Sequence, residues 1–175
     1  MKGLVVYDSY YGNTQRVAET IAEELRTEGH EAELMSVRDK RAAKTHGDIL
    51  FVGSPVRMGS TTGKAKRYIK HLDEAAWEGK PIVVFTTVLE LPENPTDAQK
   101  HSREAYDLAA GRKLGDLARS RGLNALQDLL WVEVAGMKGP LVDTGIQKTR
   151  QFTRELLSNP QGQREPAVAP AGTAT

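Results

Sequence analysis

Apolar runs of strand length alternate along this chain with segments whose apolar residues recur every three or four positions. Within residues 15–28, Val17, Ile21 and Leu25 lie four apart and charged residues fill the opposite face, which predicts an amphipathic helix. Strands alternating with helices are typical of a parallel sheet covered on both faces, so we predict an α/β fold. The pattern predicts strands at 4–7, 31–37, 48–55, 80–88 and 129–136, helices at 15–28, 63–72, 102–121 and 144–157, and a short polar helix or turn at 38–45.

Two segments lack this periodicity. For residues 89–101 we predict an irregular connection. Residues 158–175 are rich in proline and small side chains, which predicts a disordered C-terminal tail. Because the whole chain of 175 residues suits one domain with a proper core, the predicted domain spans residues 1–157.

Charge and composition exclude several classes of function. The chain has 24 Lys and Arg against 23 Asp and Glu, a net charge of +1 that gives no electrostatic case for nucleic acid or an anionic membrane. No apolar run approaches the length of a membrane span or a signal-peptide core, so we expect a cytoplasmic protein without an integral membrane segment. The chain has no cysteine and its four histidines are scattered, so neither a disulfide nor a metal site is expected. Any redox chemistry therefore requires an organic cofactor.

The first predicted strand passes directly into the first helix through the residues YDSYYGNT, positions 7–14. A helix N-terminus after a buried strand offers free N–H groups and a positive dipole end, which suit a phosphate. Hydroxyls of Ser9, Tyr11 and Thr14 would add donors, and Gly12 would let the backbone approach closely. No Lys or Arg occurs in this loop. Taken alone, the turn is equally typical of a plain strand–helix connection with Asn13 as N-cap.

Residues 7–25, YDSYYGNTQRVAETIAEEL, resemble the phosphate loop and first helix of flavodoxin-like proteins. The resemblance extends over residues 1–157. It implies a five-stranded parallel sheet of order 2-1-3-4-5 that binds flavin mononucleotide (FMN) at the carboxyl ends of its strands.

Two later loops refine this resemblance. GSPVRMGS, at 53–60, is similar to the SP-x-R-x-G loop of flavodoxin-like quinone reductases and menaquinone-dependent protoporphyrinogen oxidases. The loop TTVLEL, at 86–91, lacks the acidic, aromatic character usual in electron-carrier flavodoxins, so Met58, Val88 and Leu89 are candidates to flank the flavin ring. Connection 89–101 and the VAG at 134–136 also resemble the protoporphyrinogen oxidase branch. The residues implied to bind FMN are Ser9, Tyr10, Tyr11, Gly12, Asn13, Thr14, Ser54, Pro55, Val56, Arg57, Met58, Gly59, Thr86, Thr87, Val88 and Leu89.

The resemblance leaves an enzyme and a carrier to be separated. Carrier flavodoxins are strongly acidic, whereas this chain is neutral and places Arg57 in a flavin loop, where a positive charge would raise the reduction potential. We therefore predict an FMN-dependent oxidoreductase acting on a quinone- or porphyrinogen-like substrate, with no side chain required as general acid or base. The alternatives are an electron carrier between redox partners and a flavodoxin-fold interaction module without flavin. The partner of the FMN-binding protein would be a redox protein or a small electron donor or acceptor. The oligomeric state stays open.

Overall fold

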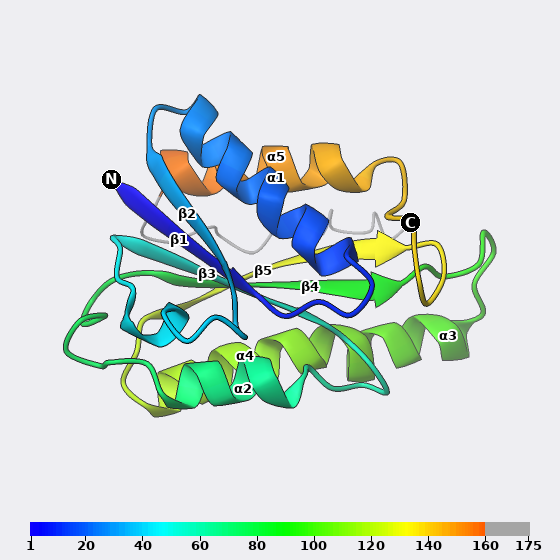
Figure 1. Cartoon of the computed structure of the whole chain (residues 1–175). Coiled ribbons are helices and arrows are strands. Elements are labelled where there is room, and N and C mark those ends of the chain that lie inside the picture. Colours follow the sequence, from blue (N-terminus) through cyan, green and yellow to red (C-terminus); the bar gives the residue numbers. More distant parts are fainter. Residues whose placement is uncertain (160–175) are drawn as a thin grey trace, which may run out of the picture.

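The computed structural model describes residues 1–159, which are built around one five-stranded parallel sheet (Figure 1). The strand order is β2-β1-β3-β4-β5, and every neighbouring pair is parallel, so the predicted fold class is confirmed. The part of the predicted tail from residue 160 on lies outside the described residues. The strands are β1 (Lys2–Tyr7), β2 (Glu31–Ser36), β3 (Ile49–Pro55), β4 (Ile82–Leu89) and β5 (Ala125–Val134).

Helices cover both faces of the sheet. Helices α1 and α5 lie on one face, and α2 and α4 lie on the other (Figure 1). Each crossover returns the chain to the amino end of the next strand, so the loops that follow the strands gather at one edge. The helical elements are α1 (Asn13–Thr27), the 3₁₀ turn η1 (Ala42–Lys44), α2 (Gly63–Lys70), α3 (Asp97–Ser102), the π-helical turn η2 (Arg103–Leu108), α4 (Ala109–Ser120) and α5 (Gly145–Ser158).

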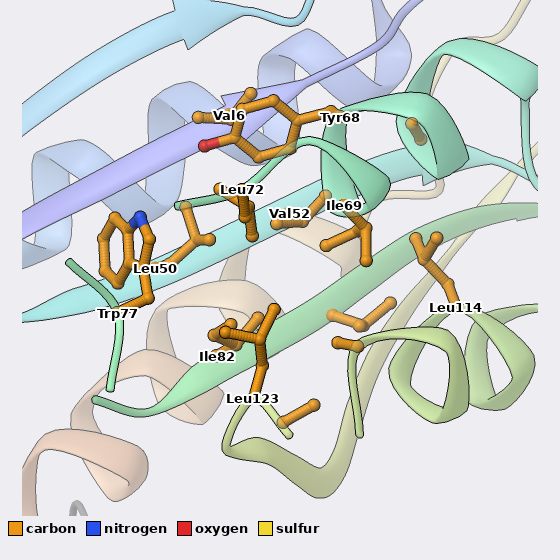
Figure 2. Close-up of a cluster of buried hydrophobic side chains, with 14 of the residues drawn as sticks. Val6, Leu50, Val52, Tyr68, Ile69, Leu72, Trp77, Ile82, Leu114 and Leu123 are labelled. Atoms are coloured by element: carbon orange, nitrogen blue, oxygen red, sulfur yellow. The ribbon is translucent and has the colours of Figure 1, made fainter. Parts of the chain in front are cut away.

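Two apolar cores, one on each face, hold these layers together. Because successive strand residues point to opposite faces, Leu4 and Val6 enter the core beneath α2 and α4, whereas Val5 enters the core beneath α1 and α5. Figure 2 shows the first of these cores, which includes Tyr68 and Val6. Burial of each large apolar side chain contributes about 1.5–3 kcal/mol, so the two cores fix the sheet and with it the edge that carries the loops.

The long helix after β4 begins earlier than predicted. The irregular connection expected up to residue 101 is helical from Asp97 onward. Thr96 is its N-cap and forms a capping box with Gln99, in which each side chain bonds to the backbone N–H of the other residue. Helix α3 buries none of its residues, so this turn carries no apolar periodicity for the sequence to reveal.

Strand β5 also begins earlier than predicted, at Ala125 rather than at residue 129. It is an edge strand whose first half places exposed or half-buried polar residues, Gln127 and Asp128, between apolar ones. Its pairing with β4 is irregular between Ile82 and Val84. A half-solvated strand with a register shift lacks the unbroken apolar run on which the prediction relied.

Candidate functional site

A cleft of about 650 Å³ lies at the carboxyl edge of the sheet. The loops after β1, β3 and β5 form its walls, together with the carboxyl end of β4 and the α3–η2 segment. Thirteen of the residues predicted to bind FMN line this cleft: Ser9, Tyr10, Tyr11, Asn13, Thr14, Pro55, Val56, Arg57, Met58, Gly59, Thr87, Val88 and Leu89.

The first loop, residues 7–14, leaves the start of α1 free for an anion. Helix α1 begins at Asn13 without any side-chain cap, so the expectation that Asn13 caps it is wrong. The Asn13 amide instead packs against Gly139, where a Cβ would collide with it. Uncapped N–H groups at the positive end of a 15-residue helix favour a phosphate.

Gly12 shapes this loop through its backbone conformation. Its φ of 91° is left-handed, and its N–H donates to Ser9 Oγ at 3.0 Å. A Cβ at Gly12 would meet nothing within 4 Å, so the glycine is required by its φ rather than by a close neighbour.

The second loop, residues 53–60, contains a tight hairpin that leaves one apolar side chain exposed to solvent. Arg57 and Ser60 exchange two backbone hydrogen bonds, at 2.9 and 3.0 Å. Met58 and Gly59 between them have positive φ values of 50° and 69°, which match a type I′ turn. A left-handed methionine costs about 1–2 kcal/mol, and here it leaves Met58 fully exposed at the cleft.

Cation–π contacts join the loops across the cleft. The Arg57 guanidinium lies 4.8 Å from the centre of the Tyr10 ring, which ties the second loop to the first. The Lys138 amine lies 5.9 Å from the Tyr11 ring centre, which ties the β5–α5 loop to the first loop. The walls of the cleft are therefore held by contacts between residues far apart in the sequence.

Strand β4 presents its side chains to two different places. Thr87 points to the first loop, and its hydroxyl lies 2.8 Å from that of Thr14. Thr86 points the opposite way, so its methyl group lies under Gly111 of α4 and its buried hydroxyl has no partner among the described residues. Thr86 therefore does not line the cleft, contrary to the prediction.

Ser54 and Gly12 are the other predicted residues that do not line the cleft. The buried Ser54 hydroxyl donates to the Pro55 carbonyl at 2.9 Å and accepts from the Thr62 N–H at 2.9 Å. Ser54 thereby fixes both ends of the second loop from beneath it.

The structure adds residues to the cleft that the loops alone did not predict. Ser102, Tyr106 and Asp107 come from the α3–η2 segment, and Met137 comes from the β5–α5 loop. A π-helical turn inserts an extra residue into the helix and is frequent at functional sites. The available signal was an aromatic residue, Tyr106, among the polar residues of the predicted long helix.

The cleft gathers the apolar side chains that the rest of the described surface lacks. Of the seven large apolar residues exposed within residues 1–159, six line it: Tyr10, Tyr11, Met58, Leu89, Tyr106 and Met137. Exposed apolar groups concentrated at one concave site, with hydroxyls at one end, mark a ligand site.

A buried arginine supports the wall of the cleft that the end of β4 and η2 form. The Arg103 guanidinium donates to the Leu89 carbonyl and to Asp107, the latter at 3.2 Å, and lies 3.5 Å from Glu133. It also lies 5.4 Å from the ring centre of Trp131. Arg103 thus connects β4, η2 and β5 behind the cleft.

Two further observations concern the described chain as a whole. No helix in residues 1–159 is long and apolar enough to cross a membrane. Within the same residues, no three His, Asp or Glu side chains are grouped to hold a metal ion.

The sheet order, the uncapped helix start and the cleft at the carboxyl edge are typical of α/β proteins that bind a mononucleotide at the β1/β3 switch point. Residues 4–139 match the family model described as a flavodoxin domain, and the chain belongs to this flavodoxin domain family. The family's cofactor is FMN, so the cofactor predicted from the sequence is confirmed. The donors at the start of α1 and the apolar cleft fit the phosphate and the ring of FMN.

Similar proteins carry the same family name. The chain is 36% identical over 91 residues to a flavodoxin of Aquifex aeolicus (strain VF5), an alignment that spans 49% of each chain. The chain thus aligns with about half the length of this curated relative. Its fold is similar to oxidised flavodoxin 2 from Bacillus cereus, with a TM-score of 0.63, 21% identity, and coverage of 90% of this chain and 99% of the other. A WrbA-like flavodoxin protein from Agrobacterium tumefaciens gives a TM-score of 0.57 and 21% identity, with coverage of 90% and 95%.

Proposed function

We propose that the chain is an FMN-dependent oxidoreductase whose second substrate is a flat apolar molecule of the quinone or porphyrinogen type. The observation that carries this proposal is the concentration of exposed Tyr, Met and Leu side chains around one cleft. An electron carrier needs only an exposed ring edge, whereas a flat organic substrate needs apolar walls on which to stack.

In this proposal the first loop holds the FMN phosphate. The free N–H groups at the start of α1 and the hydroxyls of Ser9 and Thr14 would donate to it. Bound FMN supplies the redox chemistry, and the protein sets its orientation and its electronic environment. We place this site in a domain that ends with α5.

Apolar side chains would form the binding site of the second substrate. Met58 and Tyr106 lie on the second loop and on η2, where a Cβ added to Gly59 would approach Tyr106 Cβ to 3.2 Å. Together they would form a wall that excludes water from the ring face. Arg57, held over Tyr10, would add a positive charge close to the ring.

The second candidate is an electron carrier, which the flavodoxin names of the relatives favour. A quinone takes up two electrons and two protons to become a hydroquinone, whereas a haem protein acceptor takes single electrons. Protein loaded with FMN and reduced with dithionite would therefore be mixed anaerobically with menadione or with cytochrome c. Absorbance would be followed by stopped flow.

The enzyme proposal expects faster oxidation by menadione, and expects Tyr106→Ser to slow that step while leaving oxidation by cytochrome c unchanged. Lys113→Gln, on exposed α4 surface away from the cleft, is the control. If cytochrome c oxidises the reduced protein faster, and if Tyr106→Ser leaves the rate of oxidation by menadione unchanged, the carrier role would be assigned instead.

A further inference from the structure

The charge of this protein is unevenly distributed, although its total is nearly neutral. Residues 38–44 and 63–70 hold eight of the 24 Lys and Arg and only one of the 23 Asp and Glu. The remaining residues therefore carry sixteen cations against twenty-two acids. The eight cations are Arg38, Lys40, Arg41, Lys44, Lys64, Lys66, Arg67 and Lys70.

These two basic segments face each other across a groove of about 510 Å³. Arg38, Asp39 and Lys40, which follow β2, line one wall, and Lys64 and Arg67 of α2 line the other. The Asp39 carboxylate is paired with Arg41 at 2.7 Å. The groove shares no lining residue with the FMN cleft, so both can be filled at once.

The cations of the groove are poorly neutralised. Lys40, Lys64 and Arg67 are exposed and make no ion pair with any residue of the described chain. Arg38 lies 3.5 Å from the buried Asp8 carboxylate, so it alone has a counterion. Like charges that face each other across a concavity raise its positive potential, which an anion would lower.

The floor of the groove is an aromatic side chain with a polar end. Tyr68 lines the groove, is only 6% exposed, and belongs to the core that includes Val6 (Figure 2). Its hydroxyl has no partner within the described residues. Burial raises the pKa of Tyr68, which keeps the hydroxyl protonated and therefore a donor.

We propose that this groove binds a small ligand carrying at least two phosphate groups. Lys and Arg on opposite walls suit separate phosphates, and Arg67 offers the planar fork that binds phosphate oxygens in pairs. A concave groove with cations on both walls encloses a small polyanion better than it fits the flat surface of a macromolecule. The FMN loop has no Lys or Arg, so the two sites recognise phosphate by different means.

Calorimetric titration of the full chain loaded with FMN tests the proposal at low ionic strength. The probes are pyrophosphate, orthophosphate and ADP. We expect one pyrophosphate per chain, bound at least about tenfold more tightly than orthophosphate. ADP that binds like pyrophosphate would indicate recognition of the phosphates alone, and tighter ADP binding would indicate a nucleotide; both outcomes support the groove.

Matched double variants locate the site. Lys64→Gln with Arg67→Gln should weaken pyrophosphate binding at least about tenfold, whereas Lys100→Gln with Lys113→Gln should change it less than about twofold. Flavin fluorescence should stay constant throughout. The proposal is overturned if no saturable binding occurs, if both double variants lose affinity equally, or if pyrophosphate releases FMN. Binding of RNA or of an acidic polypeptide without any binding of pyrophosphate would overturn it as well.

Discussion

The hydroxyls of Thr14 and Thr87 lie 2.8 Å apart, although 73 residues separate them in the sequence. Both side chains are buried, and together they join the start of α1 to the end of β4 at the cleft. In such a pair one hydroxyl donates to the other, so one O–H remains available to a ligand. The pair links the first loop to the carboxyl end of β4, and both line the cleft.

This pairing predicts that Thr14→Val and Thr87→Val each weaken FMN binding by about 1–3 kcal/mol, because either change leaves the other hydroxyl buried without its partner. The double variant should lose less than the sum of the two. Flavin fluorescence titration measures all three affinities. Thr86→Val is the control, since Thr86 does not line the cleft and its hydroxyl has no partner among the described residues. Parent-like binding by both single variants would place the phosphate elsewhere.

Gly12→Ala should lower FMN affinity about tenfold, or about 1.4 kcal/mol. The reason is the φ of 91°, which a residue with a Cβ adopts only at a cost, so the loop would relax away from its binding conformation. Gly29→Ala is a matched control, because Gly29 has a similar φ of 82° beyond the other end of α1. That variant should lose thermal stability and keep its FMN affinity. Equal affinity losses in the two variants would indicate global destabilisation instead.

Arg57→Ala should make the reduction potential of the bound flavin more negative. A unit charge about 5 Å away at an effective dielectric of about 20 contributes roughly 3 kcal/mol, or about 0.1 V for one electron. Because Arg57 is exposed to solvent and salt, the expected shift in the reduction potential is smaller, some tens of millivolts. Arg57→Lys keeps the charge and should restore much of the potential. Spectroelectrochemistry at low ionic strength measures all three proteins. An unchanged or more positive potential in Arg57→Ala would remove Arg57 from the flavin's surroundings and weaken the enzyme proposal.

Arg103→Met should destabilise the protein by about 1–3 kcal/mol, because it removes the hydrogen bonds of a buried guanidinium and leaves the half-buried Asp107 and Glu133 without their shared cation. FMN affinity should fall as well, since the Leu89 carbonyl loses its donor and Leu89 lines the cleft. Urea unfolding and fluorescence titration report the two effects. The exposed pair of Arg112 and Glu104, 2.6 Å apart, provides the control: Arg112→Met should cost less than about 1 kcal/mol.

The stability of the α1–α5 contact should depend on pH. Burial alone would raise the pKa of Glu24, but hydrogen bonds from Arg154 and Arg150 outweigh it and lower the pKa below its ordinary value of 4.5. A lowered folded pKa contributes stability that is fully present above pH 4.5 and is lost as the pH falls through the folded value.

Glu24→Gln should therefore destabilise by about 1–3 kcal/mol at neutral pH, with a smaller difference from the parent at about pH 3. Urea midpoints at both pH values measure this. Glu78→Gln, at an exposed site, should change little at either pH. A loss in Glu24→Gln that does not depend on pH would mean that packing, not charge, stabilises this contact.

The sequence by itself determined the order of the main elements and the edge of the sheet at which the cleft lies. Unbroken apolar runs such as 49–52 and the period of Val17, Ile21 and Leu25 are local signals, because a buried strand and an amphipathic helix each impose their own spacing. The first loop was recognisable for the same reason, since strand end, glycine and helix start follow each other within eight residues.

Only the tertiary structure decided which side chains meet at the cleft. Whether Thr86 or Thr87 faces the first loop depends on how β4 sits between β3 and β5, and Met58 is exposed because the hairpin forces a positive φ. Tyr106 lies at the cleft because it is part of the π-helical turn, and the spacing of apolar residues in the sequence does not predict that turn. The positions of Thr87 and Tyr106 depend on residues distant along the chain, so packing rather than local propensity determines them.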